Sequence, residues 1–117
     1  MEKAGVTMRQ DGEPDETLGA LIARVRAENG VTQLRLAARL CAAAGMPTVT
    51  RHEVSRWERG ERIPTGYWLA WLALTLNVSL EQLERATAAT RRQREWTRSG
   101  RERWRELTVG VYKRIAS

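Results

Sequence analysis

The sequence predicts an all-α protein, with five short helices in residues 15–90 and a further amphipathic helix near the C-terminus. Three observations predict this class. Apolar residues recur at intervals of three and four, helix-capping residues precede these runs, and no stretch alternates between apolar and polar residues as a half-buried strand would. Hydrophobic residues make up 42% of the 117 residues, so the chain can bury one compact core.

Charge is distributed unevenly along the chain and suggests three parts. Residues 1–20 hold five acidic and two basic side chains, whereas residues 91–117 hold three acidic and nine basic ones. The surplus of six in the last segment equals the formal net charge of +6 of the whole chain. We therefore expect a flexible acidic arm at 1–14, a helical domain at 15–90 and a basic tail at 91–117.

Several classes of protein are disfavoured by what the chain lacks. Cys41 is the only cysteine and His52 the only histidine, so the sequence predicts no metal site and no disulfide framework. Since no glycine-rich phosphate loop is present either, we expect neither a cofactor nor an enzyme. The longest apolar run, 67–74, has eight residues where a membrane helix needs about 20, and no apolar leader follows Met1. A cytoplasmic protein is expected.

Caps and apolar spacing predict the first two helices. Asp15 or Thr17 can cap the first helix, and Gly30 ends it as a left-handed residue. Thr32 caps the second helix, which we expect to end before Gly45. The apolar positions at helical spacing are Leu18, Leu21, Ile22 and Val25 in the first helix and Leu36, Ala37 and Leu40 in the second.

Three further helices complete the predicted domain. Thr50 and Glu53 form a capping-box pair that opens the third helix. A fourth, strongly apolar helix is expected over 66–76, and the capping box of Ser79 and Gln82 opens a fifth. The predicted core positions of these helices are Val54, Trp57, Leu69, Leu72, Ala73, Leu76, Leu80 and Leu83.

One pair of strings is far more specific than this spacing. Residues 32–37 read Thr-Gln-Leu-Arg-Leu-Ala, and residues 54–64 read Val-Ser-Arg-Trp-Glu-Arg-Gly-Glu-Arg-Ile-Pro. Two short helices joined by a turn, the second with polar residues outward, follow the order of a helix-turn-helix. Over residues 15–86 the chain resembles the Cro/repressor (XRE) family of DNA-binding domains. The resemblance implies a five-helix repressor-like fold and a bacterial or phage transcriptional regulator that binds double-stranded DNA sequence-specifically.

Helix geometry and the resemblance together indicate which residues contact DNA. With Val54 and Trp57 facing inward, the first turns of the third helix present polar side chains to the major groove. The expected base contacts are Arg51, His52, Ser55, Arg56 and, as the resemblance implies, Gln33. The expected phosphate contacts are Thr32, Thr50, Arg59 and Arg62. For the histidine and the last two arginines, a solvated surface position is the alternative. The resemblance also implies that Arg26 pairs with Glu58.

The chain departs from the family pattern in one respect. Leu40 and Trp57 lie 17 positions apart, whereas the family usually has about ten. The second helix, the turn after it or both must therefore be longer than usual. This difference leaves the full set of base contacts open.

The tail admits three interpretations. Gly100 predicts a break, followed by an amphipathic helix over 101–116. The apolar stripe, which can pair two chains as a homodimer, consists of Trp104, Leu107, Val111 and Ile115. The arginines that can follow the DNA backbone are Arg91, Arg92, Arg94 and Arg98. Alternatively, the stripe and Trp96 fold back onto the core of the same chain.

We therefore expect a regulator that represses by occupying DNA as a homodimer, without a small-molecule effector, as a phage or prophage lysogeny-type repressor does. The alternative is an antitoxin that binds a toxin through its tail and autoregulates its operon. A basic amphipathic helix at a membrane surface would explain the tail but not the motif in residues 54–64.

Overall fold

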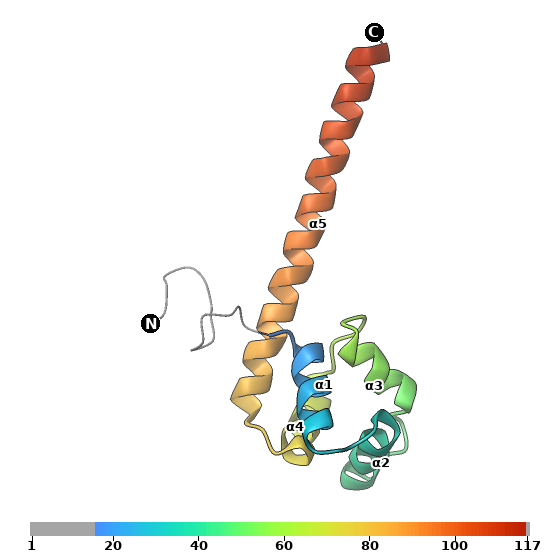
Figure 1. The fold of residues 1–117 in the computed structure, drawn as a ribbon, viewed down its shortest axis with the longest axis vertical. Helices are drawn as coiled ribbons and strands as arrows, with labels where there is room; N and C mark the ends of the chain where they lie inside the picture. Colours follow the sequence, from blue (N-terminus) through green and yellow to red (C-terminus); the bar gives the residue numbers. More distant parts are fainter. Residues whose placement is uncertain (1–15, 117) are drawn as a thin grey trace.

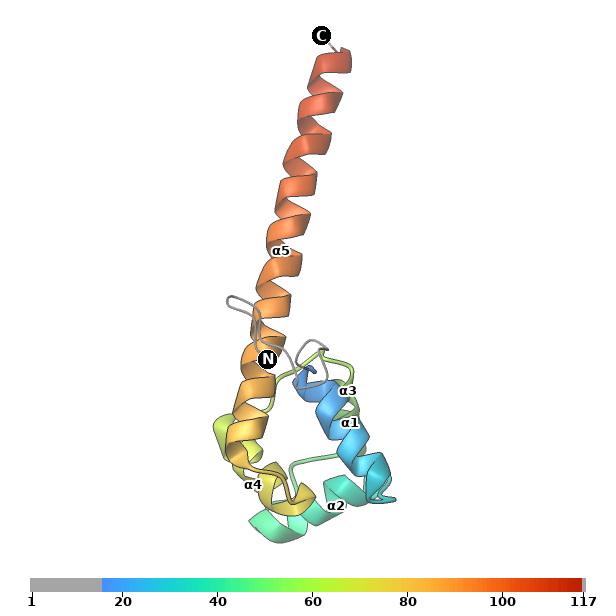
Figure 2. The ribbon, with the colours of Figure 1, turned by 60° about the vertical axis from the view of Figure 1, so that its left-hand side comes forward.

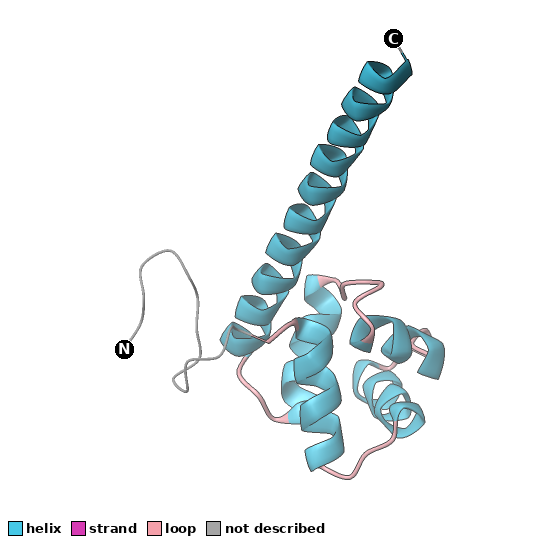
Figure 3. Ribbon diagram, turned by 45° about the horizontal axis from the view of Figure 1, so that its top comes forward, coloured by secondary structure: helices cyan, strands magenta, loops and turns pink. Residues whose placement is uncertain are grey.

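The computed structural model describes residues 16–116, with side chains as far as residue 109. Its five helices are α1 (Leu18–Glu28), α2 (Gln33–Ala44), α3 (Arg51–Glu58), α4 (Gly66–Leu76) and α5 (Leu80–Ala116). The first four helices and the start of α5 form a bundle, and the rest of α5 extends from it as a rod (Figures 1 and 2). The described part contains only helices and loops, which confirms the all-α class (Figure 3). The predicted arm at 1–14 lies outside the described residues.

Each helix begins at a side chain that satisfies one of its free backbone N–H groups. The Thr32 hydroxyl accepts a hydrogen bond from the Arg35 N–H at 3.0 Å, and Ser79 accepts from the Gln82 N–H at 3.0 Å. Thr17, Thr50 and Thr65 cap α1, α3 and α4 in the same way. Such caps contribute roughly 1 kcal/mol each. The predicted caps are confirmed, and Thr65 is one that the sequence analysis did not assign.

The helix ends follow the predicted residues as well. Gly30, Gly45 and Gly60 have φ of 66°, 69° and 74°, and Asn77 after α4 has φ of 57°. Glycine adopts this left-handed conformation without a steric penalty, and asparagine is among the few other residues that visit it often. Each of the first four helices is therefore followed by a left-handed residue, and those after α1 and α2 are the predicted Gly30 and Gly45.

One core joins the five helices. Its fully buried members include one or more side chains from every helix, and Trp57 is 2% exposed. Those with the largest buried side chains are Leu18, Ile22, Leu36, Leu40, Val54, Leu72 and Leu83. Burial of each contributes roughly 2 kcal/mol relative to exposure. The buried positions of α3, Val54 and Trp57, fix which face of this helix points outward.

The connection between α2 and α3 is longer than the three or four residues that are typical of the motif. Residues 45–50 form it, and its one buried side chain, that of Val49, is 5% exposed. The Cys41 thiol donates a hydrogen bond to the Val49 carbonyl at 3.1 Å. The extra length that the sequence predicts therefore lies at least partly in this connection, which is anchored to α2 and to the core.

Helix α5 corrects one prediction. It runs without interruption through Gly100, where a break was expected. A glycine inside a helix lowers helix stability by about 1 kcal/mol. Arginine and glutamate near Gly100 have high helix propensity, so the 37-residue helix continues through it. The boundary between domain and tail that was predicted near residue 90 therefore falls inside a continuous helix.

The interpretation that the tail folds back onto the core is wrong. Trp96 is 76% exposed, Trp104 is 70% exposed and Leu107 is 58% exposed. Residues 96–107 belong to the part of α5 that extends beyond the bundle, coloured orange to red in Figure 1. Val111 and Ile115 belong to the same helix, but their side chains lie outside the described part. The two described members of the stripe, Trp104 and Leu107, are therefore exposed in this chain.

Helices α1 and α3 pack in close contact at Gly19. A Cβ on Gly19 would lie 2.6 Å from the Trp57 carbonyl oxygen and closer still to that of Glu58. Backbone oxygens cannot move aside as a flexible side chain does, so only glycine permits this approach. Helix α1 can therefore approach the end of α3 this closely only because Gly19 has no Cβ.

We expect Gly19→Ala to lower the free energy of unfolding by about 2 kcal/mol, because it overpacks this contact. Gly66→Ala is the matched control, since a Cβ there meets open space at the start of α4. That variant should be neutral or slightly stabilising. Urea unfolding followed by circular dichroism measures both, and equal stabilities for the two variants would contradict the close packing.

Candidate nucleic-acid interface

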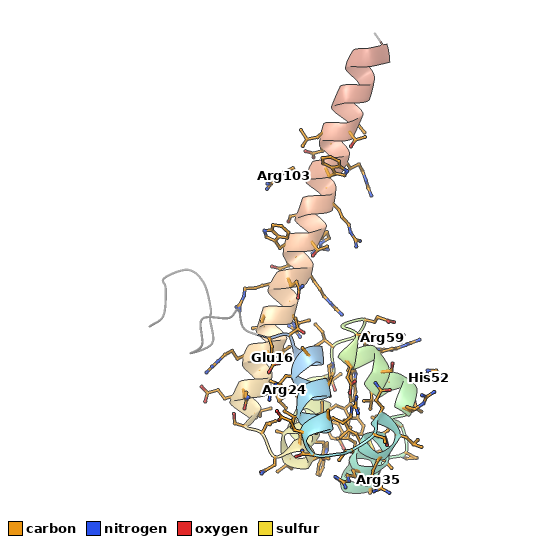
Figure 4. All side chains as sticks on the ribbon, viewed as in Figure 1. Glu16, Arg24, Arg35, His52, Arg59 and Arg103 are labelled. Atoms are coloured by element: carbon orange, nitrogen blue, oxygen red, sulfur yellow. The ribbon has the colours of Figure 1, made fainter. Side chains whose placement is uncertain are left out.

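The outer face of α3 carries the predicted base-contacting residues. Arg51, His52 and Arg56 are exposed, and Ser55 is half-buried beside them. His52 points away from the bundle (Figure 4). The structure therefore brings these four polar side chains together on one helix face, opposite its buried residues.

The start of α2 lies against the C-terminal end of α3. Thr32 is exposed at the cap of α2, and the Gln33 amide nitrogen donates a hydrogen bond to Glu58 Oε1 at 2.9 Å. Gln33 was expected to contact DNA, but this bond was not expected, because its partner lies 25 residues away in the sequence. Gln33 is thus held in place by α3, and its carbonyl oxygen and second amide hydrogen remain for other contacts.

Glu58 also pairs with α1. Arg26 donates from Nε to Glu58 Oε2 at 2.6 Å and from Nη2 to Oε1 at 3.0 Å. A third bond runs from Arg26 Nη1 to the Val31 carbonyl at 2.9 Å. The hydrogen bonds to Glu58 hold the pKa of Arg26 above its ordinary value, although desolvation opposes this shift. The pair that the resemblance implied is therefore present, and it links α1, α2 and α3.

The loop after α3 carries the two arginines predicted to contact phosphate. Arg59 Nε lies 2.9 Å from Glu61 Oε2, and Arg62 Nε lies 3.6 Å from Glu53 Oε2. Both arginine side chains are about 60% exposed, at 59% and 60%. Exposed ion pairs contribute 0–1 kcal/mol or so. Either arginine could therefore leave its carboxylate partner for a DNA phosphate at little cost in free energy.

The four tail arginines fall into two groups. All of them are exposed, but only Arg94 and Arg98 line the hollow between α5 and the end of α3. Arg94 donates a hydrogen bond to the Gly60 carbonyl, directly after α3. Arg91 and Arg92 do not line this hollow. The structure therefore brings part of the tail into contact with the predicted interface.

A family model described as Helix-turn-helix matches residues 22–83. The chain belongs to the helix-turn-helix family. The match begins within α1 and ends at Leu83, near the start of α5, so it includes the whole of α2, α3 and α4. The chain has no match among curated proteins or among solved structures.

The helix-turn-helix domain is of the Cro/repressor type, and the protein is a DNA-binding transcriptional regulator. Members of this family are DNA-binding regulators and are not typically enzymes. No described helix combines the length and apolar character that crossing a membrane requires. Among the described residues, no group of three or more His, Cys, Asp or Glu could hold a metal ion.

We expect Glu58→Ala to destabilise the helix-turn-helix domain by about 3 kcal/mol, because it leaves the half-buried Arg26 without a partner. Glu61→Ala removes an exposed pair with Arg59 and should change stability by less than about 0.5 kcal/mol. Urea unfolding measures both. A loss no greater for Glu58→Ala than for Glu61→Ala would show that the Arg26 pair does not support the fold.

Proposed function

We propose that the protein is a transcriptional repressor that reads operator DNA in the major groove with α3. The observation that carries this proposal is the exposed polar face of α3, which is backed by a buried face and by the bonds of Glu58. With its side chains an α-helix such as α3 is about 10–12 Å in diameter, which matches the major-groove width of about 12 Å. A rigidly mounted helix of this size suits recognition of base edges.

The proposed base contacts are those of the sequence analysis. Arg51 and Arg56 have the planar fork that binds guanine O6 and N7, and each such contact discriminates by about 1–3 kcal/mol. Ser55 can donate or accept a hydrogen bond, and His52 can contact a base or a phosphate. Gln33 reaches the DNA with the amide hydrogen and the oxygen that Glu58 leaves unused.

The proposed phosphate contacts position the domain without reading sequence. Thr32 and Thr50 each accept a hydrogen bond from their own helix, so the hydroxyl hydrogen remains for a phosphate oxygen. The N-terminal ends of α2 and α3 favour an anion at the same place. Arg59 and Arg62 would add charge from the loop that follows α3.

We propose that two copies associate through the exposed stripe of α5, with Trp104 and Leu107 at its described end. Such a dimer would place two α3 helices on two half-sites about 34 Å apart. Two tail arginines that do not line the hollow, Arg91 and Arg92, would follow the DNA backbone. The stripe also fits an antitoxin, for which a toxin would cover it instead of a second copy. Either protein would act in the bacterial cytoplasm.

We expect Arg51→Ala and Arg56→Ala to lose preference at defined base pairs. Selection of duplexes from a random pool by the unaltered chain supplies the binding site, and fluorescence anisotropy then compares single base changes in each variant. Arg35→Ala is the control, because Arg35 lies on the exposed part of α2 away from α3 (Figure 4). Equal weakening on every duplex would show that the two α3 arginines contact only phosphates.

We expect the chain to sediment as a dimer at tens of micromolar and Leu107→Glu to sediment as a monomer. A charge at the stripe has to be desolvated on association, which costs several kcal/mol. Leu74→Glu is the control, because Leu74 is a 73% exposed leucine on α4, outside the stripe. A monomer without any substitution would contradict the homodimer and favour a different protein as the partner of the stripe.

A further inference from the structure

A pocket of about 500 Å³ lies between the end of α3, the start of α1 and the middle of α5. Arg94, Arg98 and Arg101 line its α5 side at intervals of four and three, so they share one helix face. Arg59 and Gly60 line it from the end of α3. Its volume falls within the range of about 300–1,000 Å³ that is common for small-molecule sites.

The pocket carries a surplus of positive charge. Its one carboxylate, that of Glu58, is neutralised by Arg26. Within residues 16–109, no carboxylate lies within ion-pair distance of Arg94, Arg98 or Arg101. These three guanidinium groups therefore face the pocket without an acidic partner from the described part of the chain.

The neutral residues of the pocket also suit an anion. Thr17, Thr90, Gln93 and Thr97 line it between the arginines. Thr90 holds the start of α1 against α5, because its hydroxyl accepts a hydrogen bond from the Leu18 N–H at 2.9 Å. This buried bond fixes the start of α1 to α5 beside the pocket, whereas the α5 arginines of the pocket are exposed.

We propose that this pocket is a binding site for phosphate groups, of the kind that a ligand with two or more negative charges carries. Arginine presents several donors in a planar fork that matches phosphate oxygens, and four arginines line this pocket. The sequence analysis expected no small-molecule effector. The pocket forms because α5 passes the end of α3, and the sequence of residues 91–101 does not indicate this arrangement.

The pocket is connected to the proposed recognition helix by the residues at the end of α3. Arg94 donates to the Gly60 carbonyl, and Arg59, a proposed DNA-phosphate contact, lines the same pocket. Figure 4 shows Arg59 at the end of α3 that lies nearer to α5. A phosphate bound in the pocket therefore touches the turn that follows the proposed recognition helix.

The phosphate has two conceivable sources, and the test separates them. One is a free phosphorylated compound, for which inorganic pyrophosphate is the probe. The other is the backbone of DNA that flanks the operator, and this arm rests on the proposed function. The pocket variant is Arg98→Gln with Arg101→Gln, which leaves the bond between Arg94 and Gly60 intact.

The control variant is Arg85→Gln with Arg103→Gln, because neither arginine lines the pocket and neither is a proposed DNA contact. It removes the same charge from α5, but from the side opposite the pocket, as Arg103 shows (Figure 4). Calorimetry at low salt measures pyrophosphate binding by the full chain without DNA. Anisotropy then compares a duplex that holds only the selected site with one extended by several base pairs on each side. Circular dichroism confirms that all variants fold.

We expect the pocket variant to bind pyrophosphate at least tenfold more weakly, with the control within twofold of the unaltered chain. This result assigns a free phosphorylated ligand whether or not the chain binds the duplexes. If pyrophosphate does not bind, the duplex arm decides. The pocket then binds the DNA backbone if the unaltered chain and the control bind the longer duplex more tightly than the shorter one and the pocket variant does not. Equal losses in pocket and control variants, or no effect in either arm, would overturn the proposal.

Discussion

The arrangement of the first three helices depends on one carboxylate, that of Glu58. Both of its oxygens receive hydrogen bonds, from Arg26 of α1 and from Gln33 of α2, and its side chain is only 8% exposed. Alone, such a charge would be costly to bury. Its partners remove most of this cost only when the three helices adopt one geometry. We interpret the pair as a determinant of helix orientation more than a source of net stability.

This orientation matters because α3 could not form its outer face by itself. A helix of eight residues is marginal in water, where isolated helices need about 12–15 residues. Val54 and Trp57 set its rotation in the core, and Gly19 lets α1 approach its last turn. The exposed Arg51 and Arg56 are therefore held by contacts on the opposite side of the helix, and the recognition surface is a product of tertiary packing.

Local features of the fold could be predicted from the residues themselves. Of the non-local bonds, only the pair of Arg26 with Glu58 was expected, and that expectation came from the family resemblance. Caps such as Thr32 and end residues such as Gly45 act within a few positions, so their pattern is legible in the sequence. The outward face of α3 follows from the spacing of two apolar residues. By contrast, the bond from Gln33 to Glu58 spans 25 positions and that from Arg94 to Gly60 spans 34. The break expected at Gly100 was wrong, because one glycine inside a helix costs only about 1 kcal/mol and does not interrupt α5.

The continuity of α5 gives the basic tail a definite position relative to the recognition helix. Leu83 and Ala86 anchor the start of α5 in the core, and the same helix then carries the pocket arginines and the stripe. At 3.6 residues per turn, Arg94 and Leu107 lie on different sides of α5. A break at Gly100 would have let the stripe move independently of α3. In a continuous helix, a partner bound at the stripe and a phosphate bound in the pocket both act on one rod. The start of this rod is packed in the DNA-binding domain, so Arg94, Arg98 and Arg101 are held at a fixed place beside the end of α3.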